Sequence, residues 1–200
     1  MKGTRPLSND EIRKVACRFD GTFASRNRGL FVLGVSTGGR ISELLSLKVA
    51  DVYQNGAAVG DLLFDKGIVK GGEVSRAVPV NIDGRTAIEA LIVWHVEHYG
   101  GIDAQRPLFP SRQGSGALNR RTAHAVLKVA FEDAGLNGKL ATHSMRKSFA
   151  QRLYEETRDI FAVQEMLGHK SVATTQAYLG VNYASLKDAV EAIAFTTENE

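Results

Sequence analysis

Apolar residues recur along most of the chain at the three- and four-residue spacing of a helix, which predicts a largely helical fold. Ser8 and Glu11 have the spacing of a capping box, and we expect the helix that follows to run to about Phe19. Residues 24–37 are apolar enough for a buried helix, and the two glycines directly after them should end it. Helical spacing predicts further helices at residues 40–47, 85–99, 119–134, 142–157, 159–167, 172–179 and 183–194.

The hydrophobic period changes between residues 56 and 80, where glycines separate short runs rich in Val, Leu and Ile. This pattern predicts a three-stranded antiparallel meander whose last strand, residues 74–80, closes at Pro79. The expected fold class is therefore α+β, predominantly helical, with one small three-stranded antiparallel sheet. The loop at residues 106–118 contains two prolines and two glycines, so it is the best candidate for an internal break.

Composition adds that the chain is a globular domain. Of its 200 residues, 44% are hydrophobic and 24% are charged, which excludes a wholly disordered chain. The apolar runs are too short to span a bilayer, and no apolar segment of signal-peptide type follows the basic N-terminus. The single cysteine, Cys17, excludes an internal disulfide and a multi-cysteine metal site, and it suits a reducing compartment. We expect a cytoplasmic protein that makes no membrane contact.

Charge is distributed unevenly around the net value of +3. Residues 181–200 contain one base and four acids, so the rest of the chain holds 24 bases and 18 acids. A basic body with an acidic tail permits a polyanion partner such as DNA, although this excess alone does not establish one.

Six side chains together have the chemistry for metal-free phosphoryl transfer through a covalent tyrosine. Two planar arginine side chains can neutralise the non-bridging oxygens of a phosphodiester as charge builds during transfer. Nearby cations and a histidine can help a tyrosine hydroxyl to lose its proton despite a reference pKa of about 10, and a lysine can protonate the leaving oxygen. The six are Arg40, Lys70, His143, Arg146, His169 and Tyr178. Each alone has a plainer explanation, as a packed, capping or solvated side chain.

Four segments in the same order resemble the characteristic boxes of the tyrosine recombinases, the phage integrase family. They match the first-arginine box, the lysine hairpin, the His-x-x-Arg box and the closing histidine and tyrosine of that family. The segments are residues 39–47, residues 70–72 with 76–80, residues 142–150, and residues 167–171 with 174–178. The similarity extends over about residues 8 to 195, and it implies the catalytic fold of that family.

The resemblance also implies a role for each side chain. Tyr178 would attack the scissile phosphate, leaving a 3′-phosphotyrosyl link and a free 5′-hydroxyl. Arg40 and Arg146 would grip the phosphate oxygens. His143 would act as the general acid and base beside the attacking oxygen, and His169 would donate a hydrogen bond to the phosphate.

The resemblance also implies roles for two further residues, a lysine and a glutamate. Lys70 would protonate the leaving oxygen; Lys66 is the weaker candidate because it does not directly precede the glycines. Glu43 would orient Arg40. Ligation would proceed by reversal, so no cofactor, metal or ATP is implied. The implied partner is double-stranded DNA, with a homo-oligomer, a tetramer, on DNA and a monomer without it.

The chain departs from the family pattern at its ends. Residues 1–180 would form the catalytic domain, with no N-terminal core-binding domain before it, so an excised domain and a naturally short protein are both open. Without that second domain we expect weak, strongly salt-dependent DNA binding. Residues 181–200 would add a C-terminal helix and acidic tail to the same domain. Its apolar residues, Leu186, Val190 and Ile193, could dock on their own core or on a neighbouring protomer.

Two other functions stay open at this stage. A DNA-binding module could keep the fold without cutting, although it would not need the tyrosine together with both arginines. A type IB topoisomerase-like enzyme shares the chemistry but relaxes DNA as a monomer. The short spacing between His169 and Tyr178 and the small size of the chain favour the recombinase.

Overall fold

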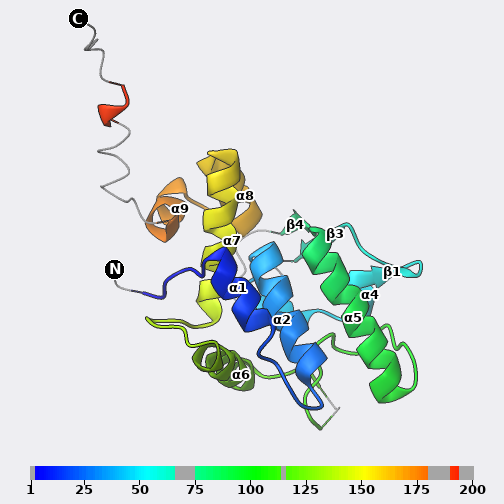
Figure 1. Cartoon of the computed structure of the whole chain (residues 1–200). Helices are drawn as coiled ribbons and strands as arrows, with labels where there is room; N and C mark the ends of the chain where they lie inside the picture. The colour runs from blue at the N-terminus through cyan, green and yellow to red at the C-terminus, as the bar shows by residue number, and fades with distance from the viewer. Residues whose placement is uncertain (1–2, 66–74, 114–115, 180–189, 194–200) are drawn as a thin grey trace, which may run out of the picture.

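The computed structural model describes residues 3–65, 75–113, 116–179 and 190–193, and these form helices packed around two small strand pairs (Figure 1). The helices within these ranges are α1 Asn9–Ala16, α2 Ala24–Thr37, α3 Ile41–Ser46, α4 Val49–Val52, α5 Ile82–Tyr99, α6 Arg120–Asp133, α7 Thr142–Thr157, α8 Ile160–Leu167 and α9 Val172–Leu179. The strands are β1 Tyr53–Gln54, β2 Ala57–Ala58, β3 Asp61–Phe64 and β4 Arg76–Pro79.

The predicted helices within these ranges are confirmed, with differences at two ends. The capping box of Ser8 and Glu11 is present, but α1 ends at Ala16 rather than near Phe19 because the next backbone N–H bonds three residues back and tightens the last turn. Helix α5 begins three residues before the expected position because the Asn81 side chain accepts from the N–H of Gly84 and caps it. The helix predicted at residues 183–194 lies mostly outside the described residues.

The predicted three-stranded meander is wrong, because the described strands form two separate antiparallel pairs. Strand β1 pairs with β2, and β3 pairs with β4 in a register that sets Leu62 opposite Val78. Only Val59 and Gly60 separate β2 from β3, and their backbone bonds point to different partners. The N–H of Val59 bonds the carbonyl of Val52, whereas the carbonyl of Gly60 accepts from Val80. The chain therefore turns from one pair to the other instead of adding a third strand. The start of the predicted last strand, residue 74, lies outside the described residues.

Helix α2 lies at the centre and contributes to two apolar clusters. Leu30 and Leu33 pack with residues of α3, β3, β4 and α5, while Phe31 and Val35 pack with α1, α6 and α7. Because both sides of α2 are buried, it has no single apolar stripe.

The loop at residues 106–118 is not an internal break. Leu108 and Phe109 are fully buried in the main core. The N–H of Leu108 donates to the carbonyl of Leu47, and the N–H of Leu118 donates to the carbonyl of Phe109. The loop therefore belongs to the same packed unit as the helices on either side.

The C-terminal end of α2 is the point at which the parts of the candidate site meet. Helix α3 starts just after it, α7 packs along it, and α8 and α9 pack on α7 (Figure 1). No helix in the described part of the chain has the length and apolarity needed to cross a membrane.

Candidate active site

Arg40 stands at the turn between α2 and α3. Helix α2 ends at Gly38, whose φ of +63° is a left-handed conformation that glycine adopts readily. Two residues later Arg40 caps α3, and its backbone N–H donates to Oε2 of Glu43 at 2.6 Å while its Nη1 donates to Oε1 at 3.0 Å. The arginine side chain is thus held by the first turn of its own short helix. It keeps partial exposure, at 26%.

Glu43 is buried and binds a second arginine, Arg76, at the start of β4. Arg76 donates from Nη1 to Oε1 at 3.0 Å and from Nη2 to Oε2 at 2.8 Å. Burial by itself would raise the pKa of Glu43, but the bonds and charges of Arg76 and then of Arg40 outweigh it and lower that pKa to about 2. Glu43 is therefore an ionised carboxylate between two guanidinium groups.

Arg146 is buried in the first half of α7 and joins two helix ends. Its Nη1 donates to the carbonyl of Gly38 at 2.6 Å, and its Nη2 donates to the carbonyl of Leu167. Burial, together with the charges of Arg40 and Arg76, lowers the pKa of Arg146 to about 10. Three guanidinium groups therefore lie close to one another around one carboxylate, which leaves an excess of positive charge.

His169 and Tyr178 complete the buried cluster. Gly168 ends α8 in a left-handed turn and presents His169, whose Nδ1 is hydrogen-bonded with the Thr175 hydroxyl at 3.0 Å. The rings of His169 and Tyr178 meet edge to face, with centroids 5.4 Å apart.

The hydroxyl of Tyr178 is buried and, among the described residues, makes no hydrogen bond. Burial raises its pKa, whereas the charges of Arg146 and Arg40 act to lower it. The guanidinium of Arg146 is close enough to favour the phenolate but does not meet hydrogen-bond geometry in this arrangement. A buried polar group without a partner is unfavourable, so this hydroxyl is poised to bind or react with a group that enters the site.

His143 lies at the edge of the cluster, on the first turn of α7. It lines an open groove together with Lys139, Lys147 and Tyr178. Burial, followed by the charges of Arg146 and Arg40, lowers the pKa of His143, which favours the neutral imidazole that can accept a proton. The ammonium of Lys147 lies 5.4 Å from the centre of the Tyr178 ring. The groove is therefore basic along the side from which Tyr178 is approached.

The structure brings Arg40, Arg146, His169 and Tyr178 together and sets His143 beside them. Glu43 contacts Arg40 as expected. Lys70 and the weaker candidate Lys66 lie outside the described residues.

Sequence reasoning missed Arg76 as a site residue. In β4 it alternates with Ala77 and so shares the buried face of Val78. An arginine on the inward face of a strand needs a buried anion, and that pattern could have identified Arg76.

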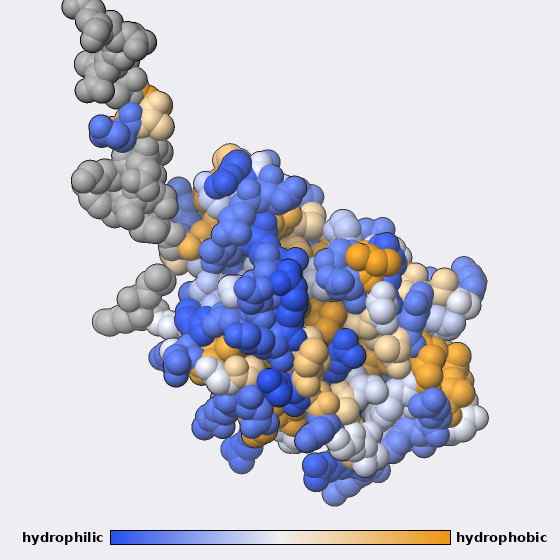
Figure 2. Space-filling view, viewed as in Figure 1, coloured by the Kyte–Doolittle hydropathy of each residue, from blue (hydrophilic) through white to orange (hydrophobic). Residues whose placement is uncertain are grey.

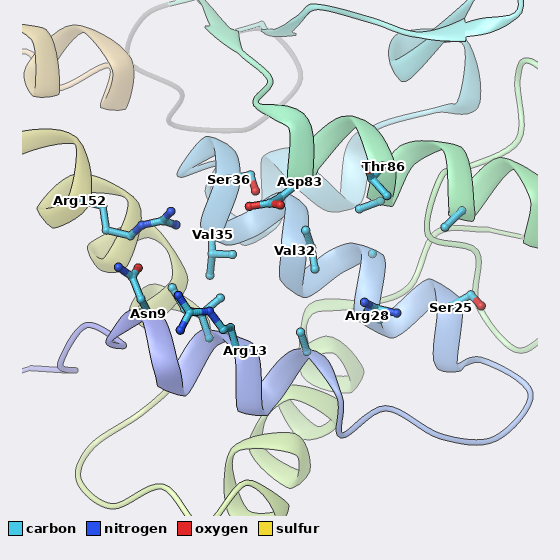
Figure 3. Close-up of a pocket in the computed structure, with 15 residues that line it drawn as sticks. Asn9, Arg13, Ser25, Arg28, Val32, Val35, Ser36, Asp83, Thr86 and Arg152 are labelled. Carbon is cyan, nitrogen blue, oxygen red and sulfur yellow. The ribbon is translucent and has the colours of Figure 1, made fainter. Parts of the chain in front are cut away.

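A separate cavity of about 480 Å³ lies between α1, α2 and α5 (Figure 3). Its lining includes Arg13, Arg28 and Arg152 together with Val32 and Val35 of α2. It contains none of the candidate site residues.

The molecular face seen in Figure 2 is largely hydrophilic over α1 and α7, with apolar patches between the helices. Within the described ranges, no group of three or more histidine, cysteine, aspartate or glutamate side chains is arranged to hold a metal ion.

Comparison with known proteins identifies relatives over nearly the whole chain. The model of the phage integrase family matches residues 6–185. The tyrosine recombinase XerD of Mycobacterium leprae is 39% identical over 178 residues, covering 86% of this chain and 53% of the relative. The tyrosine recombinase XerC of Xanthomonas campestris pv. campestris is 34% identical over 189 residues, covering 92% and 53% respectively. The chain thus spans about half the length of these relatives.

Solved structures agree with the sequence relatives. A XerH site-specific recombinase bound to a palindromic difH substrate matches with a TM-score of 0.74 and 30% identity, over 96% of this chain and 54% of that one. A lambda integrase dimer bound to a COC′ core site matches with a TM-score of 0.64 and 25% identity, over 90% and 61%. The mainly helical fold with small antiparallel sheets is that of the tyrosine recombinase catalytic domain. On the family match, these relatives and the shared fold, the chain belongs to the phage integrase family.

Proposed function

We propose that this chain carries the catalytic domain of a site-specific DNA recombinase that cuts and rejoins DNA through a 3′-phosphotyrosyl intermediate. Residues 1–180 would form this domain, and residues 181–200 would add a C-terminal helix and acidic tail to it. The single observation that carries the proposal is the buried Tyr178 hydroxyl, which has no hydrogen-bond partner in the described part of the chain and lies beside Arg146, Arg40 and His169.

In the proposed cleavage step, one bond to phosphorus forms, another breaks and two protons are transferred. The Tyr178 hydroxyl oxygen attacks phosphorus, and the bond from phosphorus to the 5′ oxygen breaks. The tyrosine proton passes to His143, whose lowered pKa suits a neutral base. Lys70 supplies the proton that the 5′ oxygen takes up. One phosphodiester replaces another, so reversal of these steps rejoins the strand without ATP or a metal ion.

The arginines would stabilise the charge of the transition state. Arg146 is held by the carbonyls of Gly38 and Leu167, and Arg40 is held by Glu43, so both are fixed before a phosphate arrives. Such preorganised donors are among the strongest contributors to catalysis because little reorganisation is needed during the reaction. His169, fixed by Thr175, would donate from its other ring nitrogen to the phosphate.

Double-stranded DNA is the proposed partner. The XerH and lambda integrase structures that match this chain are complexes with difH and core-site DNA. The basic groove lined by His143, Lys139 and Lys147 offers a phosphate backbone a route to Tyr178. Because the Tyr178 hydroxyl is buried, DNA binding has to uncover it. We also propose that monomers of the chain assemble into a tetramer on DNA.

The test is covalent capture of DNA without a chosen site. The protein is incubated in EDTA with sheared DNA from its source, denatured with SDS, and the attached fragments are sequenced. We expect adducts clustered at one sequence. Tyr178→Phe should abolish them, because the nucleophilic oxygen is removed while the ring remains.

Tyr154→Phe is the matched control. Tyr154 packs in the same small cluster as Tyr178 but has no proposed part in the chemistry, so its loss of a hydroxyl should leave adducts intact. Adducts scattered without sequence preference would indicate topoisomerase-like relaxation. Folded protein that binds DNA and forms no adduct would contradict the proposed cleavage and favour a binding module.

A further inference from the structure

We propose that Arg76 is a positioning residue that sets the geometry of both Arg40 and His169. The proposal rests on the proposed function, because the geometry in question is that of the phosphate-binding groups. Arg76 itself is buried, with a side chain only 5% exposed, so it acts through the residues that it holds.

The guanidinium of Arg76 uses all three of its nitrogens on two other elements. Nη1 and Nη2 bind the two carboxylate oxygens of Glu43 on α3, at 3.0 and 2.8 Å. Nε donates to the carbonyl of Met166, near the end of α8, at 2.8 Å. The guanidinium also stacks over the Phe64 ring, 4.7 Å from its centre, which limits its rotation. One side chain of β4 thus joins α3 to α8.

On the α3 side, Arg76 acts on Arg40 through Glu43. Glu43 accepts from Arg40 through one side-chain bond, while Arg76 occupies both carboxylate oxygens in a forked pair. Because Arg76 binds both oxygens, the Glu43 carboxylate has a fixed position, and from that position it orients Arg40. Without Arg76, Arg40 would be the nearest cation left to balance a buried carboxylate.

On the α8 side, Arg76 fixes the turn that presents His169. Met166 lies two residues before Gly168, which has a φ of +63°. A Cβ built on Gly168 would lie 3.2 Å from the Cδ of Arg76, so the arginine stem packs directly against this turn. A shift of Arg76 would therefore move the backbone that carries His169.

Two variants of Arg76 separate its charge from its shape. Arg76→Gln removes the charge and the fork, and we expect the rate of adduct formation at saturating DNA to fall about 10- to 100-fold. Arg76→Lys retains the charge but cannot reach Glu43 and Met166 together, so we expect only partial recovery. DNA affinity should change little, because Arg76 is buried away from solvent. The fall would therefore appear in the maximal rate rather than in the DNA concentration at half-saturation.

A pH profile distinguishes positioning from loss of stability. Within the described ranges, the charged groups facing Glu43 are Arg40, Arg76 and Arg146, and Asp51 and Asp65 line the neighbouring cavity. In Arg76→Gln, the Glu43 carboxylate stays buried but loses the ion pair with Arg76 that lowers its pKa. The pKa of Glu43 therefore rises. Adduct formation by this variant should fall as pH decreases through that raised pKa. The double variant Glu43→Gln/Arg76→Gln has no carboxylate to protonate at this position, so it should lose this additional fall and keep only the fall that protonation of His143 causes.

Arg26→Gln is the matched control for removing a buried arginine. Arg26 is 2% exposed and binds the carbonyl of Pro110 and the amide oxygen of Asn27. It lies twelve residues before Gly38 on the same helix, about 18 Å away along the axis. Its rate per folded molecule should match that of the wild type. The inference is overturned if Arg76→Gln also keeps the wild-type rate per folded molecule, or if Arg76→Gln and the double variant have the same pH profile.

A second readout does not depend on cleavage. The ring nitrogen resonances of His169 in ¹⁵N-labelled protein should shift in Arg76→Gln and remain unchanged in Arg26→Gln. If the wild type forms no adduct but His169 responds in this way, cleavage fails while the positioning by Arg76 stands. Unchanged His169 resonances would contradict the positioning.

Discussion

At the scale of single residues, the site is built around one buried carboxylate. Glu43 binds Arg40 and Arg76, and Arg146 lies close enough for its pKa to be affected by all three. Buried ion pairs stabilise a fold only when their hydrogen bonds are well satisfied. Here each guanidinium nitrogen of Arg76 lies 3.0 Å or less from an oxygen that accepts its hydrogen bond. The cluster is therefore organised before any ligand arrives.

The ionisation of Glu43 predicts a pH dependence of stability. Its folded pKa of about 2 lies below the ordinary value of 4.5, so its stabilisation is present above pH 4.5 and is lost as pH falls toward 2. A shift of this size corresponds to roughly 3 kcal/mol of unfolding free energy. Urea unfolding between pH 6 and pH 2.5 should show a steeper decline for the wild type than for Glu43→Gln. Parallel declines would contradict the role of this carboxylate, because other acids contribute equally to both proteins.

At the scale of elements, helix ends rather than helix faces position the site. Helices α2 and α8 both end in left-handed glycines, Gly38 and Gly168. The carbonyls of Gly38 and Leu167 at these ends are the acceptors for Arg146. A helix leaves its last carbonyls without partners inside the helix, and Arg146 satisfies one at each of two ends. The position of this arginine therefore depends on where both helices stop.

Gly38→Ala should weaken this arrangement. A Cβ at Gly38 would lie 2.4 Å from the Cδ1 of Phe149 in addition to straining the left-handed backbone. Gly135 is a matched control, since it has a φ of +68° and no atom within 4 Å of its Cβ position. We expect Gly135→Ala to lower the unfolding free energy by about 1–2 kcal/mol from strain alone. Gly38→Ala should lose about 1–3 kcal/mol more from crowding. Equal losses in urea denaturation would show that Phe149 moves aside freely.

At the scale of the whole molecule, segments far apart along the chain meet at the end of α2. Arg40 and Glu43 come from the first quarter of the sequence, whereas Arg146, His169 and Tyr178 come from its last third. Helix α9, which carries Tyr178, packs on α7 and α8 at one side of the molecule (Figure 1). The placement of the tyrosine therefore depends on the packing of α7, α8 and α9.

The residues after α9 offer a test at the same scale. Residues 181–200 are acidic, and the large apolar residues described among them, Val190 and Ile193, are 65% and 76% exposed. Exposed apolar side chains next to acidic ones suit contact with another protomer. Deletion of residues 181–200 should reduce the higher-order complexes that form on DNA, measured on native gels. Val190→Ser/Ile193→Ser should reproduce part of the effect without altering charge, and unchanged complexes in the deletion would contradict the prediction.

Features that depend on neighbouring residues could be predicted from the amino-acid sequence. Capping by Ser8, Asn119 and Asp159 acts over two or three residues, so these helix starts could be predicted from local chemistry. The candidate side chains were found because residue type and order carry their chemistry directly. Asn81 was missed as a cap although its signal is equally local.

The pairing of distant segments, in contrast, is known only from the folded chain. Strands β2 and β3 lie in the region where the sequence predicts strands, but the backbone bonds of Val59 and Gly60 to different partners divide them between two pairs. Arg76 binds Glu43 and Met166, which lie 33 and 90 residues away along the chain. The Tyr178 hydroxyl is buried without a hydrogen-bond partner among the described residues, a state that helix packing imposes. Local patterns follow from short-range sterics and hydrogen bonds, whereas these contacts exist only once the whole chain has packed.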